Sequence, residues 1–121
     1  MNRKDEPRYL CSELVDMLYE DCFGATKRSV ANLEEISTTE AALFTEEKIE
    51  PGAPISFCAK GHYLYGIVES SVFDPYLGWF VRITLDPDSQ WRGQLFVPEH
   101  LFPIGVRHLV AVTEDVTLSA A

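Results

Sequence analysis

Short alternating segments, separated by turn signals, occupy residues 32–101 of this chain and constrain its fold more than any other feature. In residues 79–86, one set of alternate positions is Trp, Val, Ile and Leu, and the other set is Phe, Arg, Thr and Asp. This period of two is typical of a half-buried β-strand. Asp-Pro pairs stand on both sides, at residues 74–75 and 86–87, and such residues favour turns because they preset φ or bond to their own backbone. The pattern therefore predicts an all-β chain.

Further strands are predicted where similar patterns recur. A loop that contains Gly24 leads into a strand at residues 28–36 and makes a hairpin with the segment before it. The other predicted strands are residues 41–44, 55–59, 62–72 and 79–85, with a short additional candidate at 93–97 before Pro98. Strands of this length and spacing are typical of a small barrel or sandwich.

Residues 9–20 fit two interpretations. Leu14, Met17 and Leu18 share one face of a helix, whereas Val15 and Met17 share one face of a strand. Periodicity alone does not choose between the two.

The size and charge of the chain limit its organisation and its partners. At 121 residues it has the length of one domain with a single core. It carries 19 acidic and 10 basic residues, a formal charge of -9, with a basic start that includes Arg3, Lys4 and Arg8. Such a balance opposes binding to a polyanion, so we expect no nucleic-acid polymer as a partner.

Location follows from what the sequence lacks. No apolar run approaches the roughly 20 residues of a membrane-spanning helix, and residues 1–8 lack the apolar segment of a signal peptide. Cys11, Cys22 and Cys58 are odd in number and follow no compact framework, which suits reduced thiols. We therefore expect a cytoplasmic protein without membrane insertion.

Two short motifs carry candidate ligand-binding residues. Lys4 and Arg8 are four residues apart, and Glu35, Ser37 and Glu40 follow the spacing of a second motif. They resemble the R-x-x-x-R and [D/N]-x-S-x-x-G motifs of the PilZ domain family. Lys4 stands in place of the first arginine, Glu35 in place of the Asp or Asn, and Glu40 in place of the glycine, while Arg8 and Ser37 keep the family's residues.

Residues 49–101 look like the scaffold half of a PilZ domain, so the resemblance extends over residues 3–102. It implies a small six-stranded antiparallel β-barrel, of the kind that binds the bacterial messenger cyclic di-GMP, with residues 9–20 as the opening strand. The implied organisation is a flexible N-terminal arm at residues 1–9, a barrel at 10–105 and a short C-terminal extension at 106–121.

The altered motif residues change what such a site can do. The resemblance implies that the two arginines hold the phosphates and stack on guanine, which suits a planar cation with several donors. Lys4 keeps the positive charge of the arginine but not its planar set of donors. Glu35 carries its carboxylate on a longer side chain than Asp, and Glu40 adds a side chain and a negative charge where the family has glycine. Lost geometry and like-charge repulsion each cost on the order of 1–3 kcal/mol. We therefore expect cyclic di-GMP binding to be weakened or lost.

The expected function is that of a non-enzymatic regulatory or adaptor domain in bacterial signalling, which acts through an unidentified protein partner and needs no cofactor. The alternative is a functional cyclic di-GMP receptor that uses the N-terminal arm with Lys4, Arg8, Glu35 and Ser37. Retention of Arg8 and Ser37 favours the receptor, whereas Lys4 and Glu40 favour the interaction domain.

Other candidate sites are weaker. Cys58 and His62 have a spacing that suits zinc, but a Lys-Gly turn separates them and no second ligand pair matches, so we expect no metal. Glu34 and Glu35 are neighbours in a predicted strand, which puts them on opposite faces and excludes a ready acid/base pair. We expect no catalytic residues.

Several aromatic residues leave two uses open, a packed core or an exposed surface for a partner: Trp79, Trp91, Phe96 and Phe102. Core packing is the commoner use of such residues. Residues 106–112 are apolar enough for another strand or a docking segment, and residues 113–121 have no decisive pattern.

Overall fold

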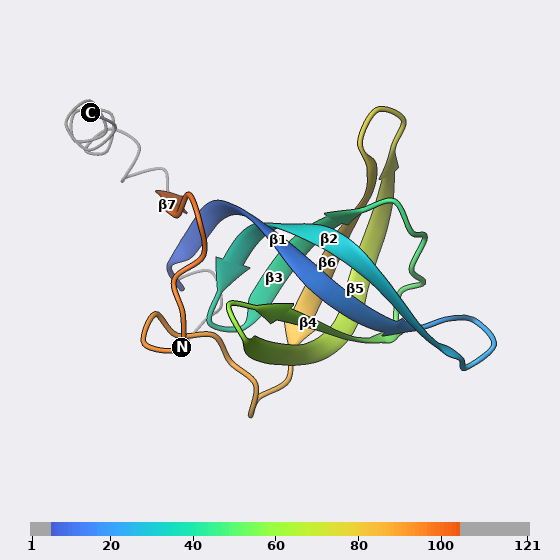
Figure 1. Cartoon of the computed structure of the whole chain (residues 1–121), viewed down its shortest axis with the longest axis horizontal. Coiled ribbons are helices and arrows are strands. Elements are labelled where there is room, and N and C mark those ends of the chain that lie inside the picture. The colour runs from blue at the N-terminus through green and yellow to red at the C-terminus, as the bar shows by residue number, and fades with distance from the viewer. Residues whose placement is uncertain (1–5, 105–121) are drawn as a thin grey trace.

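Seven β-strands make up the structure, a computed structural model that describes residues 6–104 (Figure 1). They are β1 (Arg8–Glu20), β2 (Thr26–Ser37), β3 (Glu40–Thr45), β4 (Pro54–Ala59), β5 (His62–Asp74), β6 (Gly78–Leu85) and β7 (Phe102–Ile104). This range contains no helix, and hence none with the length and apolarity that crossing a bilayer requires. The predicted all-β class is confirmed.

Antiparallel pairing closes the strands into a barrel. The sheet order is β2-β3-β6-β5-β4-β1, and β1 pairs again with β2, so six strands form a closed ring. β7 lies outside this ring and pairs with the first residues of β1. The predicted six-stranded antiparallel barrel is confirmed.

β1 resolves the ambiguity of residues 9–20 in favour of a strand. Val15 and Met17 are buried, while Leu14 is 71% exposed and Leu18 is 38% exposed. One edge of β1 pairs with β2 and the other with β4 and β7, so hydrogen bonds to neighbouring strands satisfy its backbone. Tertiary pairing therefore overrides the helical spacing of the leucines.

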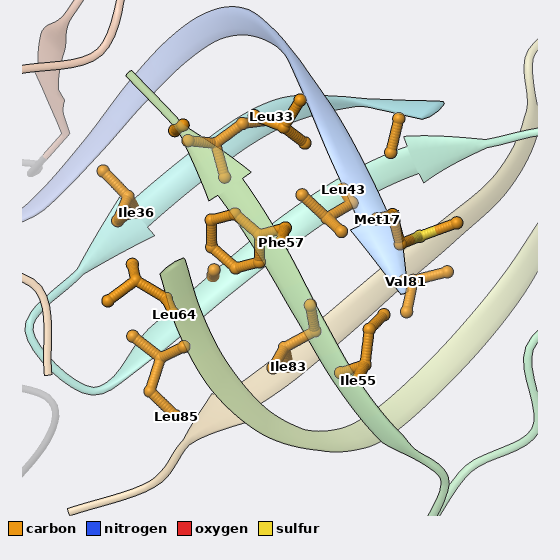
Figure 2. Close-up of a cluster of buried hydrophobic side chains, with 14 of the residues drawn as sticks. Met17, Leu33, Ile36, Leu43, Ile55, Phe57, Leu64, Val81, Ile83 and Leu85 are labelled. Atoms are coloured by element: carbon orange, nitrogen blue, oxygen red, sulfur yellow. The ribbon is translucent and has the colours of Figure 1, made fainter. Parts of the chain in front are cut away.

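Aliphatic side chains around Phe57 fill the interior of the barrel (Figure 2). Alternate residues of each strand point inward, as the pleat requires. The buried side chains labelled with Phe57 are Met17, Leu33, Ile36, Leu43, Ile55, Leu64, Val81, Ile83 and Leu85. Trp91 and Phe96 belong to the same core, which confirms core packing for these two aromatic residues.

The predicted strand at residues 93–97 is wrong, because this segment forms turns. The indole N–H of Trp91 donates to the carbonyl oxygen of Phe96 at 3.0 Å. The backbone N–H of Leu95 donates to the carbonyl oxygen of Arg92 at 2.8 Å. These bonds bend the chain so that the side chains of Trp91 and Phe96 both reach the core. In an extended strand, two residues an odd number of positions apart would point to opposite faces.

β7 is a strand that the sequence pattern does not predict. It has three residues, one of them Pro103, so it carries no periodic signal. Its position at the edge of the sheet tolerates a residue without a backbone N–H. The apolar segment 106–112 lies outside the described residues.

Two hairpins extend beyond the barrel (Figure 1). In the β1–β2 loop, the carboxylate of Asp21 accepts hydrogen bonds from the backbone N–H groups of Phe23 and Ala25, at 2.9 and 2.8 Å. In the β5–β6 loop, the carboxylate of Asp74 accepts from the backbone N–H of Tyr76 at 2.8 Å. The second loop is the Asp-Pro turn expected from the sequence. The side chain of its aspartate bonds to the backbone of the turn, which is the reason why Asp favours turns.

Gly66 of β5 lies where the backbone of β6 approaches closely. A Cβ atom at this position would be 2.3 Å from the carbonyl oxygen of Thr84 and 2.8 Å from Cγ2 of Ile83. We expect Gly66→Ala to lower the free energy of unfolding by about 1–3 kcal/mol, because a neighbouring strand must move. Urea denaturation measures the change. Gly93→Ala is the matched control, since nothing lies within 4 Å of a Cβ there, and equal midpoints for the two variants would contradict the expectation.

Candidate functional site

The structure brings four of the five candidate ligand residues to one rim of the barrel. Arg8 begins β1, Glu35 and Ser37 lie near the end of β2, and Glu40 begins β3. Arg8 pairs with Ser37 in the register of β1 and β2. The four residues, together with Arg82 of β6, line one small hollow. Lys4 lies outside the described residues.

Ser37 and Glu6 organise the turn between β2 and β3. The hydroxyl oxygen of Ser37 accepts a hydrogen bond from the backbone N–H of Glu40 at 3.0 Å, and this serine is only 3% exposed. The carboxylate of Glu6 accepts from the backbone N–H of Thr39 at 3.2 Å and from its hydroxyl at 2.9 Å. Ser37 therefore has a structural use, because a hydroxyl that bonds to a nearby backbone N–H stabilises a turn.

Glu35 lies between two arginines. Its Oε1 atom forms an ion pair with Arg8, and its Oε2 atom lies 3.4 Å from the guanidinium of Arg82. The Glu35 side chain is 12% exposed, against 44% for Arg8 and 27% for Arg82. Removal of either arginine would leave a largely covered carboxylate with one partner fewer, which is costly for a group withdrawn from water.

Arg82 is a site residue that the sequence analysis missed. Its guanidinium lies 5.6 Å from the ring centroid of Phe80, and Phe80 packs against Phe44 with ring centroids 4.9 Å apart. Stacking on an aromatic ring and pairing with a carboxylate both suit a planar guanidinium. The available signal was a lone arginine in the middle of the clearest predicted strand, at a position whose alternate neighbours are Phe80 and Thr84.

The prediction that Glu34 and Glu35 lie on opposite faces of their strand is wrong. The register between β2 and β3 shifts at this point, so Glu34 forms a β-bulge. Leu33 and Ile36, on the two sides of the pair, are both buried, and both carboxylates therefore point out of the barrel. The carboxylate of Glu34 accepts a hydrogen bond from the side-chain amide of Asn32. An extra residue in one strand interrupts the alternation on which the prediction relied.

The hollow at the rim is small, and the charges of its described lining residues cancel. The volume that a water-sized group can reach in it is about 0 Å³, whereas pockets that enclose small ligands have roughly 300–1,000 Å³. Its described charged side chains are two arginines, Arg8 and Arg82, and two glutamates, Glu35 and Glu40. An anionic ligand would therefore meet as many like charges as opposite charges on these residues.

The three cysteines lie in different surroundings: Cys11 is buried, Cys58 is partly buried and Cys22 is exposed. No group of three or more His, Cys, Asp or Glu side chains in that range is placed to hold a metal ion. The Cys11 thiol donates to the carbonyl oxygen of Leu33 at 3.6 Å. Burial, with smaller contributions from Glu34, Glu13 and Glu35, raises the pKa of Cys11 to about 12. This thiol therefore stays protonated at neutral pH.

No protein-family model, curated protein or solved structure matches this chain. The resemblance to the PilZ family thus depends on the motif residues, and it stays a prediction. The geometry shows a small barrel with a hollow at the rim, where four of those residues meet and the described lining has as many glutamates as arginines.

The cysteines should differ in reactivity. Cys22 is exposed in the β1–β2 loop, whereas Cys11 is buried and protonated. With dithionitrobenzoate at neutral pH, we expect Cys22 to react rapidly and Cys11 only after unfolding, since the thiolate is the reactive form. Cys22→Ser should remove the fast phase. Rapid reaction of a Cys22→Ser, Cys58→Ser double variant, in which Cys11 alone remains, would contradict this expectation.

Proposed function

We propose that this barrel is a non-enzymatic regulatory or adaptor domain of the bacterial cytoplasm that acts through contact with a protein partner and has weakened or lost binding of cyclic di-GMP. The observation that carries the proposal is the ion-paired arrangement of Arg8, Glu35 and Arg82 at the rim. Arg8, the residue best suited to hold a phosphate, is already ion-paired with the carboxylate of Glu35 in the same hollow.

Messenger binding at this hollow would require that arrangement to change. A phosphate that takes Arg8 must displace Glu35, whose side chain is only 12% exposed. The phosphate would also lie near Glu40, a second carboxylate in the lining. Binding is opposed by the loss of the ion pair between Arg8 and Glu35 and by repulsion between the phosphate and the carboxylates. The four described ionic side chains have no net charge, so they give no compensating attraction.

Exposed apolar side chains support contact with a protein. On the projecting β5–β6 hairpin (Figure 1), Val72, Phe73, Tyr76 and Leu77 are each at least 56% exposed. Large apolar groups gathered at one place on a surface are typical of interaction sites, whereas isolated ones need no explanation.

The alternative function is a cyclic di-GMP receptor. A specific observation favours it: four residues that are far apart in the sequence, Arg8, Glu35, Ser37 and Glu40, meet at one rim. In addition, Glu6 contacts the β2–β3 turn. This contact places the end of the N-terminal arm beside the hollow, where a ligand could be covered.

Titration calorimetry with cyclic di-GMP separates the two functions. At low and at physiological salt we expect no heat of binding to the full chain, because the arginine is paired and the hollow lacks net positive charge. Micromolar or tighter binding would contradict the proposal and make the protein a messenger receptor.

A second experiment tests whether the altered motif residues are the cause. The double substitution Lys4→Arg with Glu40→Gly restores the family residues, so we expect it to raise the affinity for cyclic di-GMP by at least about tenfold, equivalent to about 1.4 kcal/mol. Lys4→Arg with Glu46→Gly is the control, since Glu46 does not line the hollow and the change in charge is the same. No gain, or the same gain in the control, would show that the motif geometry is not as inferred.

A further inference from the structure

The outer surface of β1, β4 and β5 carries a row of apolar side chains that the rim hollow does not use. In the strand register, Leu18 lies opposite Ser56, and Ser56 lies opposite Tyr65. Pro54 lies opposite Ile67 in the next position along the same two strands. Tyr65 is 51% exposed and Ile67 is 42% exposed, so both offer apolar area to a partner.

Two neighbouring hollows on this surface form a trough. The first is lined by Leu18, Pro54, Tyr65 and Ile67 among others, and a water-sized group can reach about 320 Å³ of it. In the second, a water-sized group can reach about 570 Å³, and the lining includes Tyr63, Tyr65 and Leu95. Tyr65 and Asp86 line both hollows, so the two lie next to each other. The trough therefore has room for side chains of a partner, unlike the hollow at the rim.

The charges of the trough are of one sign. Glu20 and Asp86 line the first hollow, and Asp86 and Asp88 line the second. The described lining residues of both hollows include no Lys or Arg. The rings of Tyr63 and Tyr65 stand side by side, with centroids 6.4 Å apart. Carboxylates attract Lys and Arg, and the faces of tyrosine rings attract guanidinium groups.

We propose that the trough binds a basic segment of a protein partner in which Lys or Arg side chains alternate with apolar ones. This inference rests on the proposed function as an interaction domain and names the chemistry of its partner. Apolar side chains would cover Leu18, Tyr65 and Ile67, while cationic side chains would lie against the three carboxylates. A second copy of this chain is a poor occupant because each copy carries a formal charge of -9.

Fluorescence anisotropy of labelled peptides tests the charge and the apolar requirement together. The probe is a fluorescein-labelled peptide of alternating Lys and Leu, added to the full-length protein. We expect it to bind, and we expect a Lys/Ser peptide and a Glu/Leu peptide to bind at least about tenfold more weakly. If the Lys/Ser peptide bound as tightly as the Lys/Leu peptide, binding would reflect only a general attraction of cations, and the proposal would be overturned. Absence of Lys/Leu binding would overturn it as well.

Matched variants locate the binding surface. Asp86→Asn with Asp88→Asn should weaken binding of the Lys/Leu peptide by about tenfold. Glu34→Gln with Glu46→Gln makes the same change in net charge away from the trough and should leave the affinity unchanged. Equal weakening by the two double variants would overturn the proposal.

A second pair of variants tests the apolar contact. Tyr65→Ala should weaken binding by about tenfold, in keeping with truncation of a buried aromatic contact. Phe23→Ala removes a 90% exposed ring from the β1–β2 loop, outside the lining of the trough, and should have no effect. Circular dichroism establishes that each variant is folded. Tyr76→Ala tests the β5–β6 hairpin: loss of peptide binding with Tyr76→Ala and not with Tyr65→Ala would place the contact on the hairpin and overturn the trough while leaving the interaction domain intact. The outcome is also independent of the cyclic di-GMP titration, which tests the rim hollow.

Discussion

The antiparallel pairing of β1 with β2 is the interaction on which the rest of the structure depends, because it closes the sheet into a barrel. One edge of β1 follows β2 along most of its length, and the other edge accepts β4 and then β7. Closure satisfies the backbone groups that an open sheet would leave at its edges. It also forces alternate side chains into one enclosed interior, where they pack around Phe57 (Figure 2).

The same closure separates two chemically different surfaces. At the rim, the register that pairs Arg8 with Ser37 brings the ends of β1 and β2 together, and the arginines there are matched by Glu35 and Glu40. On the outer face of β1, β4 and β5, the carboxylates of Glu20 and Asp86 line the trough with no cation among its described lining residues. Among the described lining residues, glutamates and arginines are thus equal in number at the rim, whereas the trough has carboxylates without Lys or Arg. The proposals for the two surfaces rest on this difference in charge.

Much of the fold could be predicted, while the candidate site could be predicted only in part. Alternation in residues 79–86 predicts β6 because one face of that strand is buried and the other is not. The turn that follows Trp91 was not predictable, since its indole N–H donates to the backbone carbonyl of Phe96 and such a bond has no periodic signature. In the site, motif spacing identifies Arg8 and Glu35 as candidates, but neither their ion pair nor the participation of Arg82 is visible in local sequence. The bulge at Glu34 likewise depends on how β2 and β3 align.

The sequence by itself determined the class of structure, the positions of most strands and turns, and the strong excess of negative charge. These properties follow from local preferences: the period of two in each strand, the backbone chemistry of Asp-Pro turns, and a simple count of ionisable groups. Tertiary structure alone decided that residues 9–20 form a strand, that Glu35 joins Arg8 to Arg82, and that Tyr65 lies beside Asp86 in one trough. Each of these outcomes requires residues from different parts of the chain to meet. Such meetings are set by the register and closure of the whole sheet, which no short segment encodes.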